Sequence, residues 1–338
     1  MAQPVSIILT GDVMLGRGVN AYLLRSGSVY PWGNTLSTLS AGDLTIINLE
    51  CVIARGGKPW SRWPKVFHFH ADPIAIESLK LAGIDCVSLA NNHVLDFEEE
   101  ALREMLDLLD KSKIKHTGAG PNLTEAMQPA LLEAPDLKVA VVSFTDNEPG
   151  WAATANTPGT NYIQVSLAEE SLKVVKEIIK QSRSAGADVV IFSIHWGPNI
   201  SERPSLLFQQ FAHAVMDAGV DVFHGHSAHV FQGIEIYRGK LIIYDAGDFV
   251  DDYAVDPLLR NDRGLLFRLL VTEKKVNQIE LIPVLISNCQ VNLATATHRN
   301  AVAERIRSLS AEMGTAVHSS EERLWIEANA LCGRAQPA

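Results

Sequence analysis

The stretch Val222-Phe223-His224-Gly225-His226-Ser227-Ala228-His229-Val230 places three of the chain's 11 histidines within six residues. An apolar run leads into it from residue 218, and another, 241–244, follows soon after. This context predicts a buried strand that delivers imidazoles to a loop at its end. Neutral imidazole binds zinc, iron, manganese and similar ions, and it also carries protons. The alternative is a core strand with hydrogen-bonded histidines, but three so close together favour a metal or proton-transfer site.

The composition is that of a soluble globular protein with one large domain or two ordinary ones. The chain has 338 residues, of which 47% are hydrophobic and 20% are charged. A net charge of -10 argues against a nucleic-acid partner, which would require a basic face. It does not exclude an anionic substrate, because a bound cation can reverse the local field. The four cysteines form no CxxC pair, which favours a reducing compartment.

The amino terminus and the hydropathy indicate where the protein acts. Met1 is followed almost at once by a strand-like run, 5–9, without the basic region that opens a signal peptide. No apolar run approaches the roughly 18 residues needed to span a bilayer. We therefore expect a cytoplasmic protein without an integral membrane segment.

Apolar strand-like runs alternate with amphipathic helical segments along most of the chain, which predicts an α/β fold. Polar residues stand at the ends of six of these runs, namely Asp12, Glu50, Asn92 with His93, His195, the His224/His226/His229 group and Asp248. Because strand ends gather at one edge of such a sheet, we expect these side chains to converge. Carboxylate, carboxamide and imidazole groups together suit Mn, Fe, Zn, Mg or Ca. For Asp12 the alternative is a helix N-cap.

Two further groups of residues are candidates for chemistry and for substrate binding. Beside a metal, His93 can act as general acid or base, and Asp96 lies where it could orient that imidazole. Arg17 either grips a carboxylate or phosphate or is solvated. The loop 54–64 and the residues around it suggest a substrate-facing flap, although its tryptophans could instead pack it onto the body. The predicted substrate-binding residues are Arg17, Lys65, Trp60, Trp63 and Trp196.

Six motifs, taken in order, are specific enough to identify a family. They are Gly11-Asp12, Asn48-Leu49-Glu50, Asn91-Asn92-His93-Val94-Leu95-Asp96, His195-Trp196-Gly197, Gly225-His226-Ser227-Ala228-His229-Val230-Phe231-Gln232 and Gly247-Asp248-Phe249. Their order and spacing resemble the CapA family, the bacterial capsule or poly-γ-glutamate synthesis group of the calcineurin-like metallophosphoesterases. The resemblance covers about residues 5–315. It implies a four-layer α/β/β/α sandwich of two mixed sheets, over a domain 1–315. We expect residues 316–338 to form a C-terminal helical tail.

The resemblance also implies roles for individual residues. The metal-site positions are Asp12, Glu50, Asn92, His195, His226 and His229, and His93 is the catalytic histidine. The superfamily's opening Asp-x-His has Met14 in place of the histidine, and two residues rather than one separate His226 from His229. These departures affect one half of a dinuclear site, whereas the half made by Asn92, His195 and His226 is intact. We therefore predict one firmly bound divalent ion, with a second that is weak or absent.

Three functions are compatible with this site. The first is a metal-dependent hydrolase or transferase acting on a phosphoester, or on an amide of a glutamyl polymer or peptide. The second is a peptide epimerase, in which His93 with Asp96, and His229 with Asp12 or Asp248, remove and return a Cα proton. The third is a non-catalytic member of a polymer-export assembly, against which the full set of site residues speaks.

Overall fold

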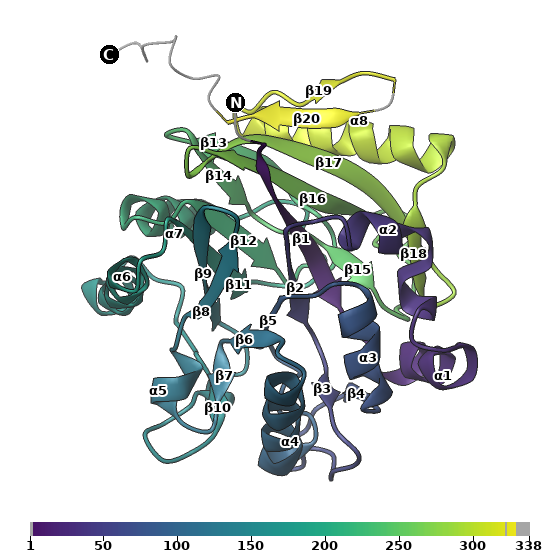
Figure 1. Cartoon of the computed structure of the whole chain (residues 1–338), viewed down its shortest axis with the longest axis vertical. Helices are drawn as coiled ribbons and strands as arrows, with labels where there is room; N and C mark the ends of the chain where they lie inside the picture. The colour runs from purple at the N-terminus through teal and green to yellow at the C-terminus, as the bar shows by residue number, and fades with distance from the viewer. Residues whose placement is uncertain (1–2, 322, 329–338) are drawn as a thin grey trace.

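The computed structural model describes residues 3–321 and 323–328, and within them two β-sheets lie face to face with helices on their outer faces (Figure 1). The first sheet contains, in chain order, β1 (Val5–Val13), β2 (Leu44–Leu49), β5 (Cys86–Ser88), β6 (Lys115–Thr117), β15 (Asp248–Val250), β16 (Arg263–Thr272), β17 (Lys275–Ser287), β18 (Gln290–Leu293), β19 (His318–Ser319) and β20 (Leu324–Glu327). The second contains β8 (Ala130–Ala134), β9 (Leu137–Thr145), β11 (Val189–His195), β12 (Val222–His226), β13 (Ile234–Tyr237) and β14 (Lys240–Ile243).

The strand orders bring the histidine-bearing strands and the carboxylate-bearing strands to the middle of their sheets. The first sheet runs β19-β20-β17-β16-β1-β2-β5-β6, with β15 beside β1 and β18 beside β17. The second runs β13-β14-β12-β11-β9-β8. Two short ladders lie outside these sheets, β3 (Val52–Ile53) with β4 (His70–Ala71) and β7 (Ala119–Gly120) with β10 (Gly159–Thr160).

Helices complete the layers. The long ones are α1 (Arg17–Ser26), α3 (Ile74–Leu81), α4 (Glu98–Lys111), α6 (Glu169–Ser184), α7 (Leu206–Asp217) and α8 (Ala296–Glu312). The short ones are η1 (Tyr30–Thr35), α2 (Leu36–Leu39), α5 (Leu123–Ala126) and η2 (Pro149–Trp151). Buried residues of α1, α3 and α4 pack on the outer face of the first sheet, and those of α6 and α7 on the outer face of the second.

Side-chain alternation along the central strands explains why they are apolar throughout. In β1, Ile7 and Leu9 point into the core between the sheets, whereas Ile8 points to the helices outside. In β11, Ile191 enters the same central core, and Phe192 packs under α6 and α7. Successive residues of a strand face opposite sides, so a strand covered on both sides must be apolar at every position. Three cores between four layers follow, which confirms the predicted α/β/β/α sandwich.

The predicted helical tail is wrong for the described part of residues 316–338. These residues form β19 and β20, and β20 pairs antiparallel with β17 at the edge of the first sheet. Leu324 and Ile326 alternate into the central core, so a two-residue period governs the segment instead of a helical one. Residue 322 and residues 329–338 of the predicted tail lie outside the described residues. Among the described helices, none combines the length and apolar character needed to cross a membrane.

Candidate metal centre

Strand register places the predicted ligands side by side at one edge of the sandwich. Asp12 at the end of β1 lies opposite Asn48 of β2 and opposite Asp248 of β15. His195 and His226 are register partners at the ends of β11 and β12, in the other sheet. The two sheets thus present carboxylates from one side and imidazoles from the other. The expected convergence of strand ends is found.

One group of donor atoms is formed by Asp12, His195 and His226, all fully or almost fully buried. The Nδ1 atoms of the two imidazoles are 3.0 Å apart, and Asp12 Oδ1 lies 3.7 Å from that of His195 and 3.5 Å from that of His226. The Asn48 amide donates to the same Asp12 oxygen over 2.7 Å. Asp12 is no helix cap, because α1 begins after Gly16 and its N-terminus receives no side-chain cap.

A second group shares Asp12 and adds Glu50 and His229. Asp12 Oδ2 lies 3.9 Å from His229 Nδ1, and Glu50 Oε1 lies 3.7 Å from His195 Nε2. The hydroxyl of Tyr253 donates to the other oxygen of Glu50 over 3.0 Å. His195 therefore faces Asp12 with one ring nitrogen and Glu50 with the other, and it connects the two groups.

Several buried polar atoms at this edge have no hydrogen-bond partner among the described residues: Glu50 Oε1, Asn92 Oδ1, His195 Nε2 and Asp248 Oδ2. In native interiors nearly all buried polar atoms have a partner, so four unpaired electron-pair donors at one edge indicate a site for a cation. Oxygen and imidazole donors in this mixture fit a divalent ion such as Mn²⁺, Fe²⁺ or Zn²⁺. The residues present therefore fit the metal that the sequence predicts.

The pKa values of the carboxylates are also consistent with a bound cation. Burial and the neighbouring Asp12 carboxylate raise the pKa of Glu50 well above its usual range. Burial, with the Asp251 and Asp12 carboxylates, likewise raises the pKa of Asp248. Burial also acts to raise the pKa of Asp12, but the imidazoles of His195, His226 and His229 outweigh it and hold that pKa low. A bound cation would keep all three carboxylates ionised.

Met14 lies where the superfamily pattern has a ligand, and its thioether serves the chain's own packing. The side chain is fully buried in the core beneath the helices. Its sulfur accepts a hydrogen bond of 3.1 Å from the backbone N–H of Gly16. A thioether engaged in this way is a poor ligand for a hard cation.

His93 and Asp96 form a buried pair at the rim of the donor groups. His93 Nδ1 is 2.6 Å from Asp96 Oδ2, and its Nε2 is 3.8 Å from Glu50 Oε1. The ring stacks on Phe69 with centroids 3.7 Å apart. Burial lowers the pKa of His93 well below its usual range and raises that of Asp96 to about 8. The imidazole is therefore neutral at neutral pH and able to accept a proton.

His229 and Asp248 form a second pair. His229 Nδ1 lies 2.8 Å from Asp248 Oδ1, which decides between the two partners left open by the sequence, since Asp12 is farther away. His229 has a left-handed backbone, with φ 59°, and Ser227 in the same loop has φ 114°. Non-glycine residues in such conformations cost of order 1–3 kcal/mol each and cluster at functional sites. The two residues between His226 and His229 thus belong to a loop that aims the second imidazole at Asp248.

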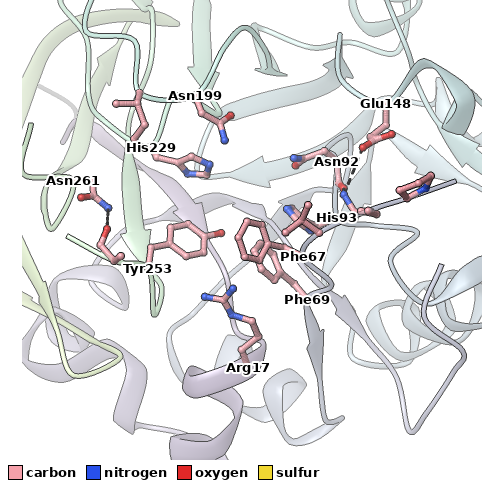
Figure 2. Close-up of a pocket in the computed structure, with 15 residues that line it drawn as sticks. Arg17, Phe67, Phe69, Asn92, His93, Glu148, Asn199, His229, Tyr253 and Asn261 are labelled. Atoms are coloured by element: carbon pink, nitrogen blue, oxygen red, sulfur yellow. Dashed lines mark hydrogen bonds and ion pairs between the residues drawn. The ribbon is translucent and has the colours of Figure 1, made fainter. Parts of the chain in front are cut away.

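The imidazoles of the two pairs, His93 and His229, line one cavity of about 570 Å³. Its lining includes His93 and Asn92 from one side and His229 and Tyr253 from another (Figure 2). This volume is in the range of pockets that take small molecules or short peptide segments. The imidazoles of both histidine–aspartate pairs, one of which belongs to the second donor group, therefore adjoin a single binding space.

The predicted substrate-binding residues divide into two sets. Arg17 and Lys65 line the cavity. Trp60 and Trp196 do not line it, and their predicted substrate contact is wrong because both side chains are buried. Trp60 packs edge-to-face on Trp151, and the Trp196 indole donates to the Tyr244 carbonyl inside the core of the second sheet. Trp63 is half-buried against Gly150 and donates to Glu148, so it supports the cavity wall without lining it.

Three residues that sequence reasoning missed hold the site together. Asn48 donates to Asp12, and Asn91 donates to Asn48 and accepts from the backbone N–H of His93. Tyr253 reaches Glu50 from a loop 203 positions later. Asn48 and Asn91 stand inside the quoted motifs and could have been found there as buried amides beside predicted ligands. Nothing local marks Tyr253, because its partner is distant in sequence.

His224, the first histidine of the opening stretch, is structural. Its side chain is fully buried, and Nε2 lies 2.9 Å from the carbonyl oxygen of Thr10, which ties β12 to β1 across the sandwich. Burial lowers the pKa of His224 to about 4, so the ring stays neutral.

Replacement of His224 by Ala should lower the free energy of unfolding by about 2–4 kcal/mol, through the lost hydrogen bond and the cavity left behind. Bound metal should be unchanged. Urea unfolding and elemental analysis of the same preparation measure the two effects. The matched control is His116→Ala on the edge strand β6, where the partly exposed imidazole pairs with Asp110 and the cost should be below about 0.5 kcal/mol. Loss of metal in His224→Ala would contradict the structural role.

Comparison with known proteins identifies the family of the chain. The chain is 30% identical over 95% of its length to a probable polyglutamine synthesis accessory protein of Mycobacterium tuberculosis, of which it covers 95%. It is 28% identical over 74% of its length to a capsule biosynthesis protein CapA of Bacillus anthracis, of which it covers 60%. A hypothetical protein from Thermus thermophilus has a similar fold, with a TM-score of 0.51 at 17% identity, covering 82% of this chain and 98% of that one. Residues 6–253 match the family model described as bacterial capsule synthesis protein PGA_cap. The chain therefore belongs to this family of bacterial capsule synthesis proteins, the CapA family that its six motifs resemble.

Proposed function

We propose that the protein is a metal-dependent hydrolase or transferase that acts on a phosphoester, or on an amide of a glutamyl polymer or peptide. The observation that carries this proposal is that His93, paired with the buried Asp96, lines the same cavity as His229 of the second donor group and as Asn92. An acid–base pair beside a metal centre is the arrangement that hydrolytic chemistry requires. The names of the relatives support a role near capsule or polyglutamine synthesis, and the word "accessory" in one of these names does not specify a reaction.

The residues that would hold the firmly bound ion are Asp12, His195 and His226, with Glu50 facing His195 from the second donor group. When bound, a divalent ion supplies Lewis-acid polarisation of a substrate oxygen and lowers the pKa of a water. Asp96 fixes the imidazole of His93 through the hydrogen bond at Nδ1, which leaves Nε2 free to take or return a proton. Phe69 stacks on the ring and keeps it in one orientation. Lys65 lies 3.5 Å from Asp96 Oδ1 and favours its ionised form.

The proposal is tested by incubating the Mn²⁺-loaded protein with an aryl phosphate, a γ-glutamyl tetrapeptide and an α-linked tetrapeptide. We expect turnover of at least one class, lost when the metal is removed by a chelator and restored when it is added back. The absence of turnover of all three, in a preparation shown to hold metal, would contradict a hydrolase.

Metal stoichiometry is a separate expected result. We predict close to one tightly bound divalent ion per chain, because Met14 cannot complete a second site. Elemental analysis after exhaustive dialysis measures it. Two ions retained per chain would overturn this prediction, and they would make the Asp12, Glu50 and His229 group a second full site.

A second candidate function is epimerisation of a peptide, favoured by one specific observation. The imidazoles of the His93–Asp96 and His229–Asp248 pairs both line the cavity, and Figure 2 shows them on different sides of it. Two proton carriers across one substrate are what removal and return of a Cα proton on opposite faces needs. Incubation of a peptide in deuterated water would show mass gain at one residue without cleavage. If His229→Gln left that exchange unchanged, the two-base arrangement would be excluded.

A further inference from the structure

The rim of the cavity carries apolar side chains that the solvent reaches. Val66 and Phe67, from the loop before β4, are 86% and 57% exposed, and Ile200, from the loop after β11, is 44% exposed. All three line the cavity together with Tyr253 and Ala254. Large exposed apolar groups that gather around a cavity mark a surface for binding an apolar group.

The two cations that line the cavity are already neutralised by the chain itself. The Arg17 guanidinium is paired with Asp252, with Nε 3.0 Å from Oδ1, and it also stacks over Phe69. Lys65 is only 8% exposed at its side chain and lies 3.6 Å from Glu148 Oε1 as well as near Asp96. Three carboxylates thus face two cations, and Glu148 remains 28% exposed at the wall.

This charge balance bears on the choice between the substrates considered above. A glutamyl polymer carries one carboxylate per residue, so it would meet Glu148 without a free cation to receive it among the described lining residues, since Arg17 is already paired with Asp252. A bound divalent ion leaves no positive excess, because the Asp12, Glu50 and Asp248 carboxylates carry three negative charges against its two positive ones. An uncharged peptide segment meets no such repulsion and gains from burial against the rim.

We propose that the cavity binds a peptide through a large apolar side chain, held against Val66, Phe67 and Ile200, in preference to a polyanionic glutamyl chain. The proposal rests on the peptide-directed function above and narrows it to one substrate class. Phe67 and Val66 are specificity-determining residues in this view, and Glu148 is the group that excludes anionic chains.

The test measures binding, so it does not depend on turnover. The probes are the blocked peptides acetyl-Gly-Phe-Gly-Gly-amide and acetyl-Gly-Ser-Gly-Gly-amide, together with γ-linked tetraglutamate. Each is titrated calorimetrically into the Mn²⁺-loaded full chain carrying His93→Ala, which prevents consumption of the probes. We expect the Phe peptide to bind at least about tenfold more tightly than the Ser peptide, as burial of most of a phenyl ring requires. Tetraglutamate should bind more weakly than both.

Substitutions at the rim complete the test. Val66→Ser with Phe67→Ser should reduce the affinity for the Phe peptide to that for the Ser peptide, and Glu148→Gln should strengthen tetraglutamate binding. The control is Leu81→Ser, at a leucine 49% exposed at the end of α3 and outside the cavity lining, which should change neither affinity. Tighter binding of tetraglutamate than of the Phe peptide, or a preference that survives the double substitution, overturns the proposal. If the chain prefers the Phe peptide but the wild type turns over none of the test substrates, the hydrolase proposal is contradicted and the proposal on peptide binding stands.

Discussion

Replacement of His226 by Ala should abolish stable metal binding. His226 is fully buried, it contributes Nδ1 to the donor group with Asp12 and His195, and Ser193 lies 2.9 Å from its other nitrogen. Loss of a hydrogen-bond partner of a ligand typically costs 10–100-fold in metal affinity, so loss of the ligand itself should exceed about 100-fold. Elemental analysis after dialysis measures the effect. As a second measure, the rise in melting temperature that metal addition produces in the wild type should disappear.

The matched control for this prediction is His213→Ala. His213 lies on α7 and is partly exposed, with its Nε2 2.9 Å from Glu235, away from the donor groups. It should retain the metal of the wild type. Since His226 is buried, circular dichroism must first show that the variant is folded. A folded His226→Ala protein with wild-type metal content would remove His226 from the site.

Replacement of His93 by Ala should abolish activity and leave the metal in place. The imidazole is the group with a free nitrogen beside the donor cluster, and general acid–base groups contribute about 10²–10⁴-fold to rate. We therefore expect a loss of that size in turnover of whichever substrate the wild-type chain accepts, with unchanged metal content. The measurement pairs initial rates with elemental analysis of the same preparation.

A conservative variant separates orientation from chemistry. Asp96→Asn keeps the size of the side chain that contacts His93 Nδ1. It replaces the carboxyl with an amide, which changes the hydrogen bonds that this side chain can donate and accept. It should show a smaller loss of rate than His93→Ala, again with metal retained. If His93→Ala lost metal as completely as His226→Ala, then His93 would be a ligand and the acid–base role would pass to another residue.

Much of the fold was predictable because the relevant signals are local. The apolar runs at 5–9, 44–49 and 188–194 are continuous because each strand is buried on both faces. The polar residues at their ends lie at one edge because parallel strands end together. The final segment was mispredicted because its pairing with β17 is formed with residues about 45 positions earlier, and a short alternating run carries little information about period.

In the candidate site, too, some features could be predicted from the sequence and others could not. Its carboxylates and imidazoles could be named from their positions at strand ends, whereas the roles of Trp60 and Trp196 could not, because an exposed and a buried tryptophan look alike in sequence. The partner of His229 could not be named either. Two aspartates were available, and the geometry of one strained loop places Asp248 nearer.

By itself, the sequence determined the α/β class through its apolar periodicity and the family through the order of its motifs, and the resemblance to that family implied the four-layer sandwich. Only the tertiary structure decided that His226 lies with Asp12 and His195 in a candidate donor group, that His229 contacts Asp248, and that His224 contacts the Thr10 carbonyl within the core. It also decided that the cations of the cavity are already paired. These outcomes depend on which strands become neighbours and in what register, and that is settled by packing two sheets together over the whole length of the chain.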